Sequence, residues 1–227
     1  MPFYATDDYR LRDNGARLFV HEFMKLVNLK HSGQPTFIAI GILIVALWFG
    51  GNDWVLALEY HRDKIAAGEL WRILTGHLVH TNTWHMLLNL TSLLFIGLLF
   101  GTLLSAKVWI AAFVFCSLAV SAAYWFIAPQ FIIYVGLSAA LYGVIIIGAL
   151  EDFNNNKLIA GALLIIVTGR VIWQQFDGAS DSLADMVDSR VAIESHLYGI
   201  VSGYVFSLIL FLSGINSDKD VTDTELD

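Results

Sequence analysis

The chain has 227 residues and a formal net charge of −7; 57% of its residues are hydrophobic and only 15% are charged. A soluble domain usually has about 25% charged residues, so this composition excludes a soluble fold and a disordered chain. The negative charge lies in loops and tails with no basic surface, which excludes a nucleic-acid partner. The single cysteine, Cys116, excludes a disulfide framework and a cysteine-based zinc site.

Apolar stretches predict an all-α membrane protein with six transmembrane helices. Several stretches of 16 to 21 residues contain no Asp, Glu, Lys or Arg, and a bilayer core about 30 Å thick needs about 20 apolar residues per helix. Two further stretches, one of them containing Arg170, complete the set. In chain order, the predicted spans are Thr36–Gly51, Trp84–Leu104, Val108–Ala128, Phe131–Leu150, Leu158–Trp173, and one that begins near Val191 or His196 and ends at Ser213.

The sequence therefore divides into a membrane domain at 36–213, an N-terminal segment at 1–35 and an acidic tail at 214–227. The N-terminal segment has the pattern of an amphipathic helix on the inner membrane surface, and a flexible leader is the alternative. Lys and Arg are enriched in cytoplasmic loops. Five such residues precede the first span, and Lys107 and Lys157 lie in the second and fourth connections. We therefore predict that both termini are cytoplasmic, although four cations in the opposite loops dilute the bias.

Polar residues recur near one end of three predicted spans. The second, fourth and sixth spans run in the same direction, so their first residues share one leaflet. His85 and Asn89 open the second span, His196 opens the sixth, and Ser138 lies seven residues into the fourth, about 10 Å deep. Polar groups in lipid normally face a bundle interior or a wet cavity. A serine, a histidine and an amide at one level are the components of an acyl-transfer site.

The chemistry of acyl transfer assigns a role to each of these side chains. Ser138 is the candidate nucleophile, and His196 is the candidate general base that then protonates the leaving amine. His85 and Asn89 are four residues apart and lie on one helix face. Both can donate hydrogen bonds to the oxyanion, as can the backbone N–H of Ser138.

Four further residues are predicted to support this site. Gly136 removes side-chain bulk before Ser138 and permits unusual dihedral angles. Tyr142 follows Ser138 by one helical turn, where its ring can hold the imidazole of His196. Gly199 and Gly203 give the sixth span a face of small residues that lets it pack closely on the fourth.

Two other kinds of site compete with this interpretation. His77, His80 and His85 lie within nine residues, and three histidines can bind zinc. However, the metalloprotease signature His-Glu-x-x-His is missing, and no predicted span holds an acidic residue that could act as a ligand or base. A transporter would show intramembrane charges or broken repeats. We expect no metal and no cofactor.

The motifs resemble those of the rhomboid family of intramembrane serine proteases, over residues 36–213. The matching motifs are Trp71-Arg72, His85-Met86-Leu87-Leu88-Asn89, Gly136-Leu137-Ser138 with Tyr142, and His196-Leu197-Tyr198-Gly199 with Gly203. The resemblance implies a six-helix rhomboid-like bundle, a catalytic dyad of Ser138 and His196, and an oxyanion hole that includes His85 and Asn89. It also implies that Trp71 and Arg72 belong to a structural loop in the outer leaflet, and that the partners are membrane-anchored protein substrates.

One departure from the family pattern points to a particular branch. Many rhomboids have Gly-x-Ser-Gly, whereas Ala139 follows the serine here, and its methyl group is expected to narrow the cleft. Gly-Leu-Ser-Ala, together with the run from Trp71 to His85, is most similar to the rhombosortases. That similarity implies a bacterial inner membrane, a site open to the periplasm, and exported substrates with a C-terminal Gly-Gly-type tail. The alternative function is a catalytically silent adaptor that binds transmembrane clients.

Overall fold

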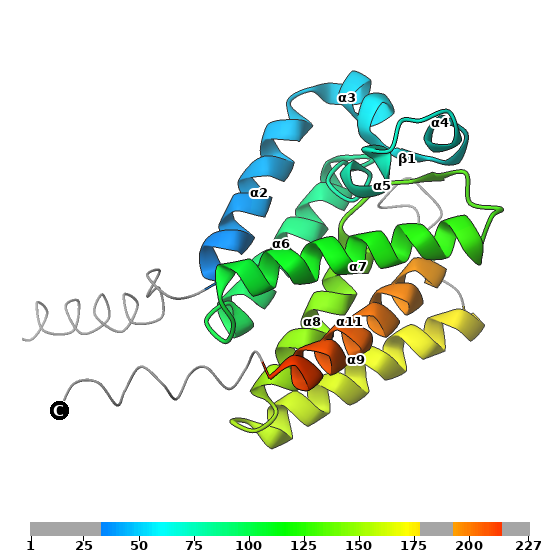
Figure 1. Cartoon of the computed structure of the whole chain (residues 1–227). Helices are drawn as coiled ribbons and strands as arrows, with labels where there is room; N and C mark the ends of the chain where they lie inside the picture. The colour runs from blue at the N-terminus through cyan, green and yellow to red at the C-terminus, as the bar shows by residue number, and fades with distance from the viewer. Residues whose placement is uncertain (1–32, 178–192, 215–227) are drawn as a thin grey trace, which may run out of the picture.

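The computed structural model describes residues 33–177 and 193–214, and its secondary structure is almost entirely helical (Figure 1). The predicted N-terminal amphipathic helix and the acidic tail after Gly214 lie outside these residues. The elements are α2 (Gln34–Trp48), α3 (Gly51–Leu58), β1 (Tyr60–His61), α4 (Arg62–Ala66), α5 (Arg72–Thr75), α6 (Thr83–Phe100), α7 (Ala106–Phe126), β2 (Ile133–Tyr134), α8 (Ser138–Asp152), α9 (Lys157–Asp177) and α11 (Ile193–Ser213).

Among the described residues, four helices are long and apolar enough to cross a membrane: α6, α7, α9 and α11. The pair α2 and α3 is a fifth candidate if the two are taken as one span, although they are bent by 117°. The chain is therefore a helical, multi-pass membrane protein. The predicted fifth span continues beyond Trp173, because α9 runs to Asp177.

The predicted span Phe131–Leu150 is wrong in its first part, because α8 begins only at Ser138. Its 15 residues measure about 22 Å, which is less than the thickness of a bilayer core. The preceding residues are extended, and Ile133 and Tyr134 form β2, which pairs antiparallel with β1. Isoleucine and tyrosine favour strands, and a short apolar run does not distinguish a strand from a buried helix.

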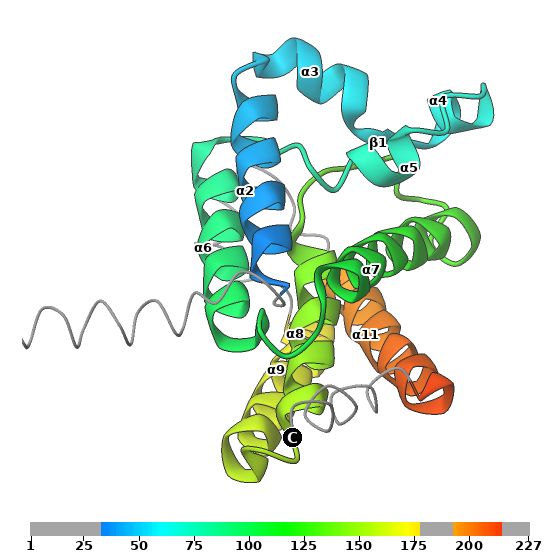
Figure 2. The same cartoon turned by 60° about the vertical axis from the view of Figure 1, so that its left-hand side comes forward.

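Helix α8 lies in the middle of the bundle and packs against α6, α7, α9 and α11 (Figures 1 and 2). Its closest partner is α11, because small residues let the two backbones approach. A Cβ atom added to Gly199 would lie 2.9 Å from the carbonyl carbon of Ala139, and one added to Gly203 would lie 2.9 Å from the Cα of Gly143. The glycine face predicted for the sixth span thus packs on α8.

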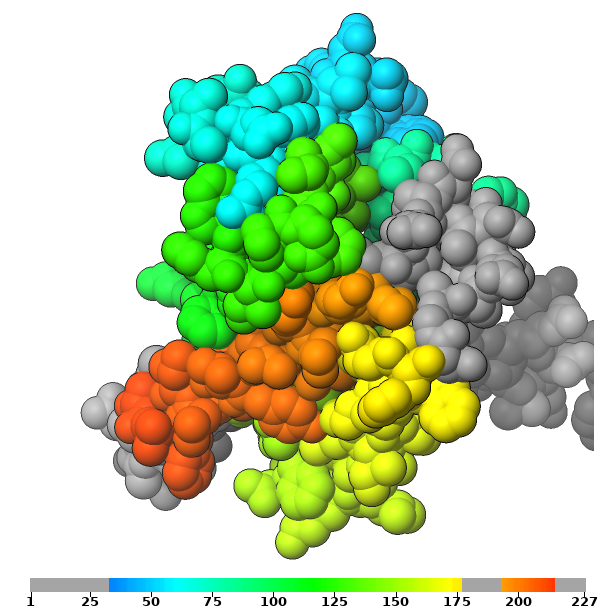
Figure 3. Space-filling model, turned by 90° about the vertical axis from the view of Figure 1, so that its right-hand side faces the viewer, coloured from blue at the N-terminus to red at the C-terminus, as the bar shows by residue number. Residues whose placement is uncertain are grey.

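Helices α9 and α11 lie side by side on one face of the molecule, as Figure 3 shows in yellow and orange. A hydrogen bond of 3.0 Å between the hydroxyls of Thr168 and Tyr204 joins them. Helices α6 and α9 both contact α8, but they pack little against each other.

Candidate active site

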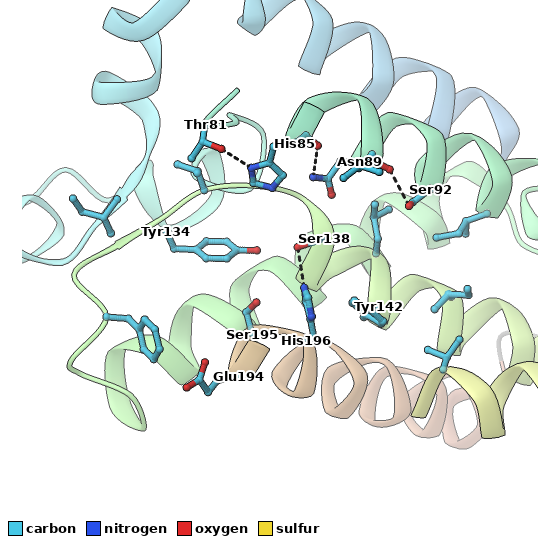
Figure 4. A pocket seen from close by; sticks show the side chains of 18 of the residues that line it. Thr81, His85, Asn89, Ser92, Tyr134, Ser138, Tyr142, Glu194, Ser195 and His196 are labelled. Carbon is cyan, nitrogen blue, oxygen red and sulfur yellow. Dashed lines mark hydrogen bonds between the residues drawn. The ribbon is translucent and has the colours of Figure 1, made fainter. Parts of the chain in front are cut away.

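The first turns of α8 and α11 bring Ser138 and His196 together. Ser138 is the first residue of α8, and His196 lies in the first turn of α11. The Nε2 atom of His196 is 3.3 Å from the Oγ atom of Ser138 (Figure 4). His196 is buried, whereas Ser138 is half-buried. A serine hydroxyl within hydrogen-bonding reach of an imidazole is the arrangement that activates a serine nucleophile.

Two further side chains contact the imidazole of His196. The ring of Tyr142 lies with its centroid 4.5 Å from that of His196, at an interplanar angle of 42°. The Oε1 atom of Gln174, on α9, is 3.4 Å from the Nδ1 atom of His196. The sequence predicted Tyr142 but missed Gln174, because the fifth span was ended at Trp173. The first glycine after that span is Gly178, and this helix-stop signal predicts the longer helix.

His85 and Asn89 lie on the other side of Ser138 from His196 (Figure 4). Helix α6 begins just before them because the side chain of Asn82 caps its first turn, accepting a bond of 2.9 Å from the N–H of His85. The Nδ1 atom of His85 is 3.1 Å from the hydroxyl of Thr81. If that hydroxyl donates, Nε2 of His85 carries the proton and can donate in turn.

Asn89 is almost completely buried, with 3% of its surface exposed. One of its amide N–H groups donates a bond of 2.9 Å to the carbonyl oxygen of His85, one helical turn earlier. A side-chain amide has a second N–H group. His85 and Asn89 thus lie beside Ser138 at the start of α8 (Figure 4).

The segment that leads into Ser138 is held in an unusual conformation. Gly136 has a φ angle of +107°, which side chains other than glycine rarely allow. A Cβ atom at this position would also lie 2.6 Å from Cε1 of His85. The N–H of Gly136 donates to the carbonyl oxygen of Gly76 at 3.0 Å, and its own carbonyl oxygen accepts from the hydroxyl of Tyr134 at 2.7 Å.

A cavity of about 870 Å³ opens onto these residues (Figure 4). Its polar lining includes His85, Asn89, Ser138 and His196, and Tyr142 contributes an aromatic ring. The rest of the wall is largely apolar and comes from α6, α8, α9 and the segment around β2. Residues of both α6 and α9 therefore line the same cavity as the polar cluster.

The matched region of the chain identifies the fold family. A family model for the rhomboid domain matches residues 67–213. The chain belongs to the rhomboid family. Rhomboids are generally intramembrane serine proteases that act on membrane-protein substrates within the bilayer, and some members are inactive. No match was found among curated proteins.

In this rhomboid, Arg72 holds the loop that precedes α6. Its side chain is buried, and its Nη1 atom donates to the carbonyl oxygens of Leu56 and Glu59 at 3.0 Å and 2.9 Å. Its Nε atom donates to the carboxylate of Glu69 at 2.6 Å. The indole of Trp71 is exposed and donates to a nearby backbone carbonyl. Trp71 and Arg72 thus brace the loop and do not contact the site.

The three histidines considered for zinc have different neighbours. His77 is 3.0 Å from the hydroxyl of Ser121, whereas the ring of His80 packs edge-on against that of His85. Within residues 33–177 and 193–214, no three His, Cys, Asp or Glu side chains form a group that could hold a metal ion. Burial lowers the pKa of His77 to about 4 and that of His80 to about 3, because desolvation disfavours the imidazolium.

The effect expected of Ala139 on the cleft is wrong. The side chain of Ala139 is fully buried in a cluster with Tyr60, Val120 and Tyr124, and it does not line the cavity. Because Ser138 begins the helix, the next side chain points away from the cleft into the packed side of α8. The methyl group therefore fills space in the core and leaves the approach to Ser138 open.

Proposed function

We propose that this rhomboid is an intramembrane serine endopeptidase in which Ser138 and His196 form the catalytic dyad. The observation that carries the proposal is the distance of 3.3 Å between Oγ of Ser138 and Nε2 of His196, at the wall of a cavity of about 870 Å³. A serine in a membrane helix usually bonds its own backbone. A serine that instead faces a buried imidazole inside a cavity is suited to nucleophilic attack.

The reaction follows from these positions. Oγ of Ser138 attacks the scissile carbonyl carbon while Nε2 of His196 takes the hydroxyl proton. The tetrahedral intermediate collapses as the imidazolium returns that proton to the leaving amine, which gives an acyl-enzyme. Water, deprotonated by the same imidazole, then attacks the ester and releases the second product. No carboxylate is needed for these proton transfers, and no cofactor takes part in them.

The oxyanion that forms during attack requires donors that are already in place. We assign this role to the side chains of His85 and Asn89 and to the backbone N–H of Ser138. The last of these lies at the N-terminus of α8, where backbone N–H groups lack partners within the helix and the helix dipole favours negative charge. Removing one such donor typically lowers kcat by about 10²–10³-fold.

We also propose that the chain crosses the bilayer six times, with α2 and α8 as the first and fourth spans and both termini in the cytoplasm. The Lys and Arg residues of the connections support this orientation. Helices α6, α8 and α11 then begin on the outer side, so the cavity opens to the periplasm of a bacterial inner membrane. In this proposal, substrate helices enter sideways between α6 and α9, which both line the cavity.

The substrate class we propose is an exported protein anchored by a C-terminal Gly-Gly-type tail, as for rhombosortases. The Gly-Leu-Ser-Ala motif and the run from Trp71 to His85 support this assignment. A helical substrate must unwind before its carbonyl carbon can be attacked, and glycine weakens a helix by about 1 kcal/mol per residue. The test is co-expression with a Gly-Gly-tailed exported protein. A tail that stays intact while another transmembrane substrate is cut would contradict the rhombosortase assignment.

The alternative function is a silent adaptor that binds transmembrane clients, and a fluorophosphonate probe on the purified protein decides between the two. We expect labelling of the wild type, and none in Ser138→Ala or His196→Ala. Ser207→Ala is the matched control, because Ser207 is buried in α11 and its hydroxyl has no partner among the described residues. An unlabelled but correctly folded wild type would favour the adaptor.

A further inference from the structure

Each of the two nitrogen atoms of the His196 imidazole lies within hydrogen-bonding distance of another side chain. Nε2 faces the hydroxyl of Ser138 at 3.3 Å, and Nδ1 faces the side-chain oxygen of Gln174 at 3.4 Å. Gln174 lies on α9 and is 2% exposed, although it is a polar residue near the end of a membrane helix. A buried amide is normally hydrogen-bonded, and here its oxygen is directed at the candidate base.

This contact bears on which tautomer the imidazole adopts. A neutral histidine has one N–H donor and one acceptor nitrogen, and an amide oxygen only accepts. A proton on Nδ1 therefore satisfies Gln174 and leaves the lone pair of Nε2 facing Ser138. The opposite tautomer would place two acceptors against each other and would present an N–H group to the serine hydroxyl. Only the first tautomer can take the proton of Ser138.

The other groups around His196 do not supply this bond. The ring of Tyr142, from α8, stacks on the imidazole. Arg170, one turn before Gln174 on α9, and His85, on α6, act on His196 through electrostatic interactions. Within the described part of the chain, Gln174 is the side chain whose oxygen lies within hydrogen-bonding distance of Nδ1.

We propose that Gln174 is a positioning residue that holds His196 in the reactive tautomer and orientation through its side-chain oxygen. The chain thus has a neutral third member beside the dyad, on a helix that packs against both α8 and α11. This inference rests on the proposed function, because a tautomer matters only if His196 acts as a base. It goes beyond that function by adding a residue that does not touch the substrate.

The experiment compares wild type, Gln174→Leu, Gln174→Glu and the matched control Gln175→Leu in detergent, with Ser138→Ala as the blank. The side chain of Gln175 also joins α9 to α11, through a bond of 3.1 Å to the carbonyl oxygen of Ile193, but it does not contact His196. The readouts are the fluorophosphonate labelling rate, kcat and KM on a single-span substrate, the pH profile of kcat/KM, and the unfolding temperature.

We expect Gln174→Leu to lower kcat and the labelling rate at least tenfold, because a hydrogen bond to the imidazolium of the transition state is lost. KM and the unfolding temperature should stay close to those of Gln175→Leu. Gln174→Glu should recover much of the lost kcat and move the acidic limb of kcat/KM to higher pH, because a carboxylate also accepts from Nδ1 and stabilises the imidazolium.

The positioning role is overturned if Gln174→Leu labels within twofold of wild type, if Gln175→Leu loses as much activity, or if Gln174→Glu is no better than Gln174→Leu. The proposed function fails separately. If wild type and Ser138→Ala are equally unlabelled, there is no reactive dyad, and the role of Gln174 fails with it.

Discussion

The N–H of Gly136 donates a hydrogen bond of 3.0 Å to the carbonyl oxygen of Gly76. This bond joins the end of α5 to the extended segment that leads into Ser138, so the loop braced by Arg72 also positions Ser138. The pairing of β1 with β2 strengthens the same connection. The position of Ser138 therefore depends on residues that are more than 60 positions away in the sequence.

Replacing Gly136 by alanine should impair the site more than it impairs the fold. The φ angle of +107° is unfavourable for alanine by about 1–2 kcal/mol, and the new methyl group would displace His85. We expect the labelling rate to fall at least tenfold. Gly68→Ala is the matched control, because Gly68 has a φ angle of +106° and open space around its Cβ position. Equal labelling in the two variants would contradict the role of Gly136.

Gly199→Ala should separate α11 from α8 and thereby move His196 away from Ser138. The added methyl group would meet the backbone of Ala139, and such overpacking is unfavourable by about 1–3 kcal/mol. We expect a lower unfolding temperature and slower labelling. Gly169→Ala, on α9, should have neither effect, because no atom lies within 4 Å of the Cβ position there. Labelling at the wild-type rate in Gly199→Ala would show that the close helix packing is not needed.

Arg72→Ala should destabilise the fold by about 3 kcal/mol, because the buried carbonyl oxygen of Glu59 and the carboxylate of Glu69 lose their charged donor. The loss is measured by thermal unfolding in detergent, and labelling should decline in parallel, since the loop holds Gly76. Lys64→Ala is the control, because Lys64 also donates to the carbonyl oxygen of Leu56, at 3.4 Å, but from an exposed position. We expect that variant to lie within about 0.5 kcal/mol of wild type. A similar effect of both substitutions would argue against a bracing role for Arg72.

The stability of the protein should fall as the pH drops below about 6.5, the ordinary pKa of histidine. The pKa of His77 is lowered to about 4 and that of His80 to about 3 in the folded state. Between the ordinary pKa of about 6.5 and these lowered values, the unfolded chain therefore binds more protons than the folded protein. Lowering the pH through this range favours unfolding. Unfolding temperatures measured from pH 7.5 to 4 check this. His77→Asn should flatten the slope, and an unchanged slope would show that His77 is not buried as a neutral ring.

The sequence predicted the membrane class, the family and the meeting of Ser138 with His196, because each depends on residue type and order. Once the direction of each span is known, polar residues at the starts of three parallel spans can be placed at the same membrane depth. The sequence did not predict where α8 begins. The apolar run before Ser138 fits a buried helix as well as an extended segment, and the choice depends on pairing with β1, which lies more than 70 residues earlier.

Gln174 and Ala139 show the same limit at the level of single side chains. Gln174 is polar at the end of an apolar run, and only the packing of α9 on α11 turns it toward His196. The burial of Ala139 depends on where α8 begins. Because the start of the helix was predicted too early, the environment of Ala139 was predicted wrongly as well. The environment of both side chains depends on the rotation of a helix about its own axis. Hydropathy does not encode that rotation.

If α8 is the fourth span, as we propose, its shortness couples the proposed activity to the acyl-chain length of the lipids. In the proposed six-span topology, a fourth span of 15 residues is roughly 8 Å shorter than a bilayer core, and Ser138 lies at its outer end, below the membrane surface. Longer acyl chains would increase the distance between the hydroxyl of Ser138 and the bulk water needed for hydrolysis. Shorter acyl chains would decrease that distance. We therefore expect turnover measured in vesicles of graded acyl length to change with membrane thickness, although the protein itself is unchanged.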